Sequence, residues 1–394
     1  MNKIILLLLA IYASYIPSFG QINSSTSFFF GHSLIDHRPP LIETPSDETT
    51  VPHWLQLLSN HANKDFAVSG KFGFLPQHAT QPVFSQWGYD IVNSAWESDY
   101  ETFAEADFTN IIITAANFIQ FQAHTENYVT DPGISPLSAT LDIIDYVTDQ
   151  EDSLKLIIYE NWPDMAQFAP DFPPSTSQLE AYYDYTSGEF NDWWINYHND
   201  LDANRPDLQI KMIPIGPIFA DLFTNSPLQD IPVLELYEDN APHGRASLYF
   251  LASLITYVGL YEEQPALDYE IPSIVHPIII DNYALIINRI WDTCLSFNFE
   301  DGRSRVFTQN IVSNIISEEN NAIHIYPNPS FDKLNIESNI SDGLVRFWNT
   351  QNVLMKQQRI NKNIDISFLN QGIYFVEIIN SKGEVVAIDK LIKL

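Results

Sequence analysis

Residues 27–34 read Ser27-Phe28-Phe29-Phe30-Gly31-His32-Ser33-Leu34, a short apolar run that ends in a glycine turn. Four further runs rich in β-branched and aromatic residues follow at 66–69, 110–114, 155–159 and 209–213. Longer periodic segments predict helices at 51–63, 138–149, 178–204, 244–261 and 273–299. Continuous apolar strands separated by helices are typical of a parallel sheet buried on both faces. We therefore predict an α/β fold, a three-layer α/β/α sandwich around a five-stranded parallel sheet.

Polar residues follow the predicted strands, at the sheet edge where α/β proteins bind their ligands. Ser33 follows the first run through a glycine turn, Gly70 follows the second, and Asn117 follows the third. An acid and a histidine, Asp239 and His243, come just before the helix predicted at 244–261. These residues form a candidate site for serine chemistry.

This constellation resembles the SGNH (GDSL) hydrolase family over residues 26–261. Its strongest parts are Phe30-Gly-His-Ser33-Leu, the stretch 237–243 (Tyr-Glu-Asp-Asn-Ala-Pro-His), and Tyr249-Phe-Leu-Ala-Ser just after it. The resemblance implies a flavodoxin-like fold, with Ser33 as nucleophile and His243 as base. It also implies an oxyanion hole made by the N–H groups of Ser33 and Gly70 and by the amide of Asn117. Serine needs such a base, and the developing oxyanion needs fixed donors.

The chain departs from the family pattern at three places. His32 replaces the aspartate after the first glycine, and Ala115-Ala116-Asn117-Phe118 replaces Gly-x-Asn-Asp. Asn240 lies three residues before His243, where the family has its aspartate, while Asp239 and Glu238 lie four and five residues before it. A carboxylate stabilises an imidazolium and an amide does not, so we prefer Asp239 and keep Glu238 and Asn240 as alternatives.

Three further residues are predicted to contact substrate. Glu160 and Trp162 follow the fourth strand, and His32 precedes the candidate nucleophile. Packing and capping roles remain open for Glu160 and Trp162.

The two ends of the chain differ from the middle. Residues 1–20 have a lysine, an apolar run and small residues before Gln21, which is typical of a secretory signal peptide. Residues 322–394 form short alternating runs separated by turn residues, which predicts a small antiparallel β-sandwich. This segment resembles the C-terminal sorting domain of the type IX secretion system, through Tyr326-Pro-Asn-Pro329, through 369–376 and through the basic end 390–394. The predicted domains are a hydrolase domain at 21–305, a linker at 306–321 and the sorting domain.

Composition argues against several other function classes. The formal net charge is -31 from 19 basic and 50 acidic side chains, so nucleic acid and anionic membrane surfaces are unfavourable partners. The single cysteine, Cys294, cannot form an intrachain disulfide and is predicted to be buried. No metal-binding helix motif, phosphate loop or dinucleotide fingerprint is present, and no segment after the signal peptide is long enough to span a membrane. We expect no metal and no cofactor.

Taken together, these patterns predict a secreted serine esterase that removes small, acetyl-like acyl groups. An acylated extracellular polysaccharide is the expected substrate, by analogy with other type IX cargo, and the type IX machinery is an expected partner. The alternative is a non-catalytic surface glycan-binding protein on a degenerate SGNH scaffold, which the altered third motif and the displaced acid favour.

Overall fold

The computed structural model describes residues 22–80, 83–85, 87–117, 121–308, 324–326, 330–337, 343–349, 354–380 and 385–393. Contacts divide the chain into two compact units, residues 1–310 and 311–394, and each unit has a hydrophobic core of its own. The predicted signal peptide and most of the predicted linker lie outside the described residues. We describe each unit by itself.

The first unit contains one parallel sheet with the strand order β3-β2-β1-β4-β5-β6. These strands are β1 (Ser24–Gly31), β2 (Asp65–Phe72), β3 (Asn93–Ser94), β4 (Asn110–Ile113), β5 (Lys155–Glu160) and β6 (Lys211–Pro214). The five predicted strands are confirmed, and the two-residue β3 adds a sixth at the edge. Among the five longer strands, the order reverses between β1 and β4, as in flavodoxin-like folds. A crevice is expected there at the carboxyl ends.

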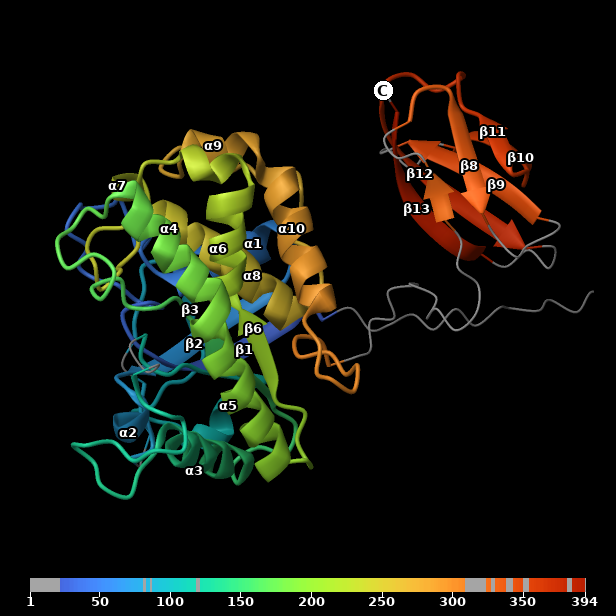
Figure 1. Ribbon diagram of the computed structural model, residues 1–394. Coiled ribbons are helices and arrows are strands. Elements are labelled where there is room, and N and C mark those ends of the chain that lie inside the picture. Colours follow the sequence, from blue (N-terminus) through green and yellow to red (C-terminus); the bar gives the residue numbers. More distant parts are fainter. Residues whose placement is uncertain are drawn as a thin grey trace, which may run out of the picture. The chain divides into compact units, whose positions relative to one another are not determined.

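Helices cover both faces of this sheet, because its strands are apolar on both sides. Phe28 and Phe30 of β1 belong to a core that includes residues of α3 (Pro136–Thr148) and α5 (Asn191–Asn204). The other face is covered by α1 (Val51–His61) and α8 (Ala246–Tyr261), which pack together and against β2, β1 and β6 (Figure 1). Every residue of α8 is buried. The predicted three-layer sandwich is therefore confirmed.

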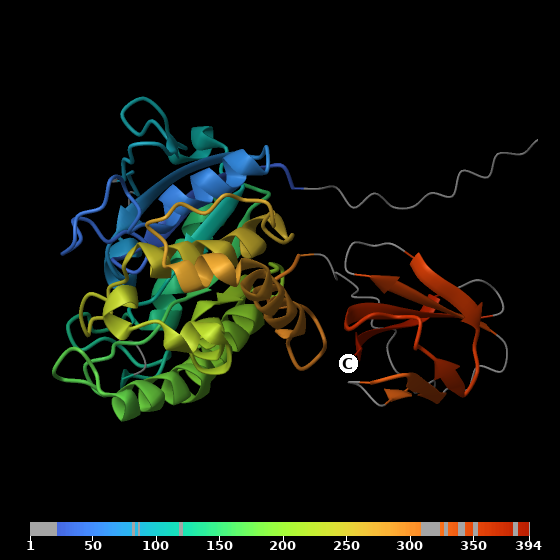
Figure 2. The ribbon, with the colours of Figure 1, turned by 90° about the horizontal axis from the view of Figure 1, so that it is seen from above.

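The helices differ in detail from the sequence-based expectation. The segment predicted at 178–204 consists of α4 (Thr176–Tyr185), a π-helical turn (Thr186–Phe190) and α5, which follow one another along the side of the unit (Figures 1 and 2). The segment predicted at 273–299 is α9 (Pro277–Asp281) and α10 (Tyr283–Ser296). Short helices α2 (Leu75–His78) and α7 (Val233–Leu236) and 3₁₀ turns at Phe103–Ala106 and Pro227–Asp230 were not predicted.

Helix α6 (Ile215–Asn225) was also missed, because Gly216 and Pro217 resemble a loop in the sequence. Proline is well tolerated in the first turn of a helix, where its missing N–H has no partner to lose. The apolar residues of α6 are buried, including Ile218, Phe219 and Leu222.

The boundary predicted after residue 305 needs a correction. Val306 is 0% exposed and Phe307 is 2% exposed, and both the backbone N–H and the hydroxyl of Thr308 donate to Glu262. Residues 306–308 therefore belong to the α/β unit, because Val306 and Phe307 are buried in it and Thr308 is bonded to it. Cys294 is buried, as predicted.

The second unit contains two small sheets. Strands β10 (Leu354–Arg359), β9 (Gly343–Asn349), β12 (Gly372–Asn380) and β13 (Val385–Lys393) form one, and β11 (Asn363–Asp365), β8 (Lys333–Glu337) and β7 (His324–Tyr326) form the other. Neighbouring strands within each sheet are antiparallel. Leu334 and Ile364 from one sheet share a core with Val345 and Val376 from the other. The predicted antiparallel sandwich is confirmed.

Candidate active site

Three predicted residues form a continuous line of hydrogen bonds at the carboxyl edge of the sheet. Ser33 lies two residues after β1, and the His243 Nε2 atom is 2.9 Å from the Ser33 Oγ atom. The His243 Nδ1 atom is 2.7 Å from the Asp239 Oδ2 atom. With its proton on Nδ1, the imidazole leaves Nε2 free to accept the serine proton, which is the arrangement a serine nucleophile needs.

Ser33 is held by backbone contacts on both sides. Its carbonyl accepts a hydrogen bond from the Tyr249 hydroxyl of α8 at 2.6 Å. The N–H groups of Ile35 and Asp36 both donate to the His32 carbonyl, which closes a tight turn around the serine. Within the part of the chain that the structure describes, the Ser33 N–H has no acceptor. It is therefore available to donate to a ligand.

His32 is buried within the turn and does not face the site. The residue is 1% exposed, and burial lowers the pKa of its ring to about 4, so it is neutral. Its Nε2 atom lies 2.9 Å from the Ala115 carbonyl, and its Nδ1 atom accepts a bond from the Leu34 N–H. His32, which was predicted to contact substrate, is buried and stabilises the turn that presents Ser33.

The loop that carries His243 is fixed by bonds to its carbonyl groups. The side chains of Asn117 and Trp162 donate to the carbonyls of Ala241 and Pro242, at 2.7 and 3.0 Å. The Met165 N–H donates to the Asn240 carbonyl. Trp162 is fully buried, so it positions this loop and does not reach substrate. Asn117 uses only one of its two amide N–H groups in this contact, and an amide can donate with both.

Asp239, Glu238 and Asn240 were all considered as partners of His243, and each makes different hydrogen bonds. Asp239 bonds the ring, and its other oxygen accepts from the N–H groups of Ala241 and His243 at 3.0 Å. Burial raises the pKa of Asp239, but these hydrogen bonds outweigh it and hold the pKa below its usual value. Asn240 donates to the carbonyls of Ala169 and Pro170 instead. Asp239 is therefore the group in contact with the imidazole.

Gly70 is not brought to this site. It lies inside β2 and pairs with Phe29, four residues before Ser33. A Cβ atom at Gly70 would lie 2.2 Å from the ring of Trp87, so the glycine is needed for packing. The glycine at the end of the strand is Gly73, with φ +154°, and its N–H donates to the Gly31 carbonyl.

Glu160 lies beneath the site and is not exposed to it. The side chain is 0% exposed; one oxygen accepts from the Asn191 amide at 2.8 Å, and the other has no partner within the described residues. Burial raises the pKa of Glu160 well above its usual value, which favours the protonated carboxyl group in the folded protein.

This burial predicts how pH affects stability through Glu160. The folded protein keeps the proton that the unfolded chain loses, so stability falls as the pH rises above the usual glutamate pKa of about 4.3. In Glu160→Gln the unfolding free energy should fall less steeply between about pH 5 and 8, by up to about 1.4 kcal/mol per pH unit. Denaturant titrations across this range measure the slope, with the exposed Glu180→Gln as the control. Equal slopes in all three proteins would refute the assignment.

His37 is a neighbour of the site that the sequence reading did not single out. Its ring stacks on the His243 ring with centroids 4.1 Å apart and planes 7° apart. Its Nε2 atom lies 3.0 Å from the Glu238 Oε2 atom. Burial lowers the pKa of His37 more than the Glu238 contact raises it, so the stacked ring is neutral. His37 therefore limits the orientations that His243 can adopt.

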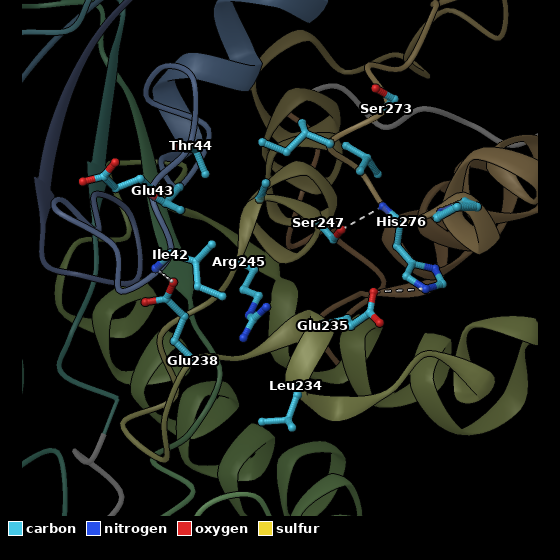
Figure 3. Close-up of a pocket in the computed structure, with 15 residues that line it drawn as sticks. Ile42, Glu43, Thr44, Leu234, Glu235, Glu238, Arg245, Ser247, Ser273 and His276 are labelled. Carbon is cyan, nitrogen blue, oxygen red and sulfur yellow. Dashed lines mark hydrogen bonds and ion pairs between the residues drawn. The ribbon is translucent and has the colours of Figure 1, made fainter.

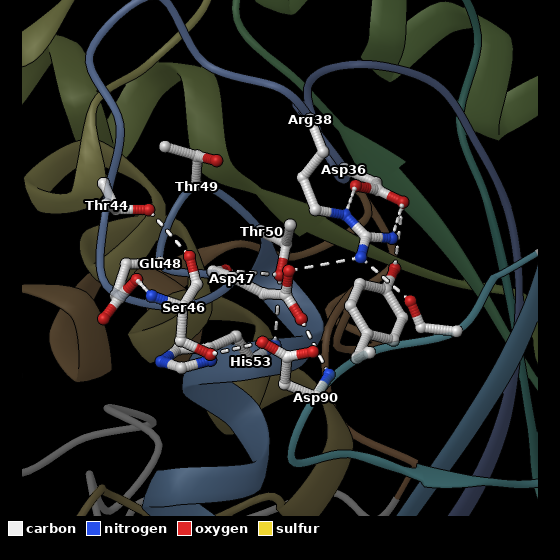
Figure 4. Close-up of polar contacts among 12 residues, drawn as sticks. Asp36, Arg38, Thr44, Ser46, Asp47, Glu48, Thr49, Thr50, His53 and Asp90 are labelled. Carbon is white, nitrogen blue, oxygen red and sulfur yellow. Dashed lines mark hydrogen bonds and ion pairs between the residues drawn. The ribbon is translucent and has the colours of Figure 1, made fainter.

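The segment around His37 is held by a polar network (Figure 4). Two guanidinium nitrogens of Arg38 bond Asp36 at 2.6 and 2.8 Å, and a third reaches Asp47. The guanidinium also lies 4.2 Å from the centre of the Tyr89 ring, whose hydroxyl donates to Asp36. This network fixes residues 36–50 beside the serine turn.

Glu238 joins this segment to the loop that carries His243. Its side chain is 1% exposed, and its carboxylate accepts from His37 and from the N–H groups of Leu41 and Ile42. Glu238→Ala should lower the unfolding free energy of the α/β unit by about 3 kcal/mol, because three partly buried donors lose a charged acceptor. Chemical denaturation measures this loss, with the exposed Glu43→Ala as the control. A loss below about 0.5 kcal/mol would show that the contact does not hold the segment.

Two residues near the site, His37 and Gly73, were not predicted from the sequence. His37 lies four residues after Ser33, and this short spacing is the signal that could have pointed to it. Gly73 was missed because Lys71 made the strand appear to end at Ser69. The Lys71 amine instead leaves the sheet and bonds the carbonyls of Gln77 and Thr80.

Comparison with known proteins assigns only the second unit. Residues 324–393 match the family described as the secretion system C-terminal sorting domain. No curated protein is similar to the chain at a significant level. The sorting domain directs the protein through the type IX secretion system to the outside of the cell or to its surface. The α/β unit has no assigned family.

Two features of the described residues bear on other partners. None of the helices described is both long and apolar enough to cross a membrane. In the same part of the chain, no group of three or more histidine, cysteine, aspartate or glutamate side chains is arranged to hold a metal ion.

Proposed function

We propose that the α/β unit is a secreted serine esterase of the SGNH type, which removes small, acetyl-like acyl groups from an extracellular carbohydrate. The observation that carries this proposal is the line of hydrogen bonds from Asp239 through His243 to Ser33. Structural histidines rarely need both an acidic partner on one nitrogen and a half-exposed serine on the other. That pairing is what activates a hydroxyl for attack on an ester.

The proposed reaction proceeds through an acyl-enzyme. His243 takes the proton of the Ser33 hydroxyl while the Oγ atom attacks the ester carbonyl, and Asp239 stabilises the imidazolium that forms. The imidazolium then protonates the leaving alcohol. Water, deprotonated by His243, attacks the acyl group, releases the carboxylic acid and restores the serine. The reaction uses only side chains and water.

Two donors could stabilise the oxyanion in this proposal. The Ser33 N–H has no acceptor among the described residues, and Asn117 keeps one amide N–H beyond its bond to Ala241. Each correctly placed donor contributes roughly 10²–10³ in rate. Gly70 is not included, because it lies inside β2.

The substrate class rests on location and analogy. The sorting domain places the protein outside the cell or on its surface, where acylated polysaccharides are accessible. The non-catalytic glycan-binding alternative has less support, because binding alone does not need a histidine aligned between an acid and a serine.

A fluorophosphonate probe tests the proposal directly. Such probes react covalently with activated serines, and we expect one adduct on the full-length chain, located at Ser33 by peptide mass spectrometry. His243→Ala should lose the adduct, because the serine is then no longer activated, while the protein melts as the wild type does. No labelling of the wild type, or labelling that persists in His243→Ala, would contradict an activated Ser33.

A further inference from the structure

A cavity of about 440 Å³ lies beside the candidate site, and Arg245 lines it (Figure 3). We call it the Arg245 pocket. Its walls come from residues 42–49, from α7, from the first residues of α8 and from residues 273–277. Glu238 connects it to the site, since this side chain lines the pocket and bonds His37, whose ring stacks on His243. Its volume is within the range of small-molecule sites.

Arg245 is an unusual cation for this protein. Its buried Nε atom has no hydrogen-bond partner, and no ion pair of its guanidinium is found within the described residues. Every other lysine and arginine in the described part of residues 22–308 donates to a carboxylate, an amide, an imidazole or a carbonyl. A unit with a large excess of acidic side chains could readily have paired Arg245. Its guanidinium is instead left available inside a cavity.

The acids near the pocket are already engaged or directed elsewhere. Glu238 accepts from His37 and from two backbone N–H groups. Glu235 pairs with His276 at 3.5 Å. Figure 3 shows Glu43 directed away from Arg245. An acceptor for the guanidinium therefore has to come from outside the described chain.

We propose that the Arg245 pocket binds the carboxylate of a small hydroxylated acid such as a sugar acid. The planar guanidinium can bond both oxygens of a carboxylate, which a neutral ligand cannot match. Ser247 and Ser273 contribute hydroxyl groups to the lining, and the Ser247 oxygen only accepts from the His276 N–H, so its own proton can be donated. Ile42, Leu234 and Val275 supply an apolar wall. Hydroxyls beside apolar side chains suit a sugar ring, whose faces are apolar and whose rim is polar.

Calorimetric titration of the full-length chain with glucuronate, and with glucose as the neutral counterpart, tests the site. We expect glucuronate to bind and glucose to give no measurable binding. Arg245→Met should weaken glucuronate binding by about 10- to 100-fold, because a charged hydrogen-bonded pair is lost. Arg205→Met removes an equal charge whose partners are Asp145 and Asp207, so it should bind as the wild type does.

Several results would overturn the proposal. Absence of glucuronate binding to the wild type, equal binding of glucose, or unchanged binding in Arg245→Met would each do so. If Arg245→Met does not fold, the comparison of the two sugars on the wild type and the weaker binding expected of Arg245→Lys still decide. Ser33→Ala should bind glucuronate as the wild type does, so a failure of the esterase proposal is distinguishable from a failure of this one.

Discussion

Ser33→Ala is expected to lower kcat/KM for hydrolysis of p-nitrophenyl acetate by about 10⁴- to 10⁶-fold. The variant keeps His243 and Asp239 but has no atom that can attack the carbonyl. The remaining rate would come from binding and from oxyanion donors alone. Initial rates of the full-length wild type and variant, measured on the same day and at the same protein concentration, give the ratio.

The control for this experiment is structural. The Ser33 side chain makes one hydrogen bond, to His243, and its main-chain contacts do not involve the hydroxyl. Alanine should therefore leave the melting temperature nearly unchanged. A folded Ser33→Ala protein with wild-type turnover would exclude Ser33 as the nucleophile. A wild type without turnover of any simple ester would favour a stringent substrate requirement or the glycan-binding alternative.

Asp239→Asn is expected to lower kcat/KM for the same ester by about 10⁴-fold while leaving the fold intact. In the native loop, one oxygen of Asp239 accepts from two backbone N–H groups, and the other accepts from His243 Nδ1. Asparagine can keep the first oxygen in place, and its amide then donates to Nδ1. The imidazole proton moves to Nε2, where it blocks transfer from Ser33.

Two comparisons make this prediction specific to the tautomer. The exposed Asp152→Asn removes one negative charge far from His243 in sequence and should retain full activity. NMR of the imidazole nitrogens should show the Asp239→Asn ring protonated on Nε2 rather than Nδ1. Activity within tenfold of the wild type would show that Asp239 is not the orienting group.

The sequence was sufficient to predict the sheet and the residues that meet at its edge. Phe28, Phe29 and Phe30 are consecutive apolar residues that are all buried, and only a strand covered on both faces buries such a run. Parallel strands bring their carboxyl ends to one edge, so residues far apart in the chain could be expected together there. Ser33 lies at this edge for this reason, while Asp239 and His243 reach it on the loop before α8.

The orientations of individual side chains at the site cannot be predicted from hydrophobic periodicity. Glu160 ends β5 and Trp162 lies two residues after it, at the edge where site residues occur, but both side chains are buried. The stacking of His37 on His243 joins two loops with no shared sequence pattern. Arg245 looks like an ordinary surface charge in the sequence, and only the pocket shows that it lacks a partner.

The wide separation of the nucleophile and its base has a consequence for when the protein can react. Ser33 and His243 are 210 residues apart in the chain, and the Tyr249 hydroxyl from α8 also fixes the serine backbone. A nascent chain that ends before residue 243 has a serine with no base and lacks the Tyr249 hydroxyl that supports its turn. Under the proposed mechanism, the protein has no esterase activity during synthesis or in any unfolded state during secretion. Activity appears only after the turn that follows β1 has packed against α8 and the loop before it.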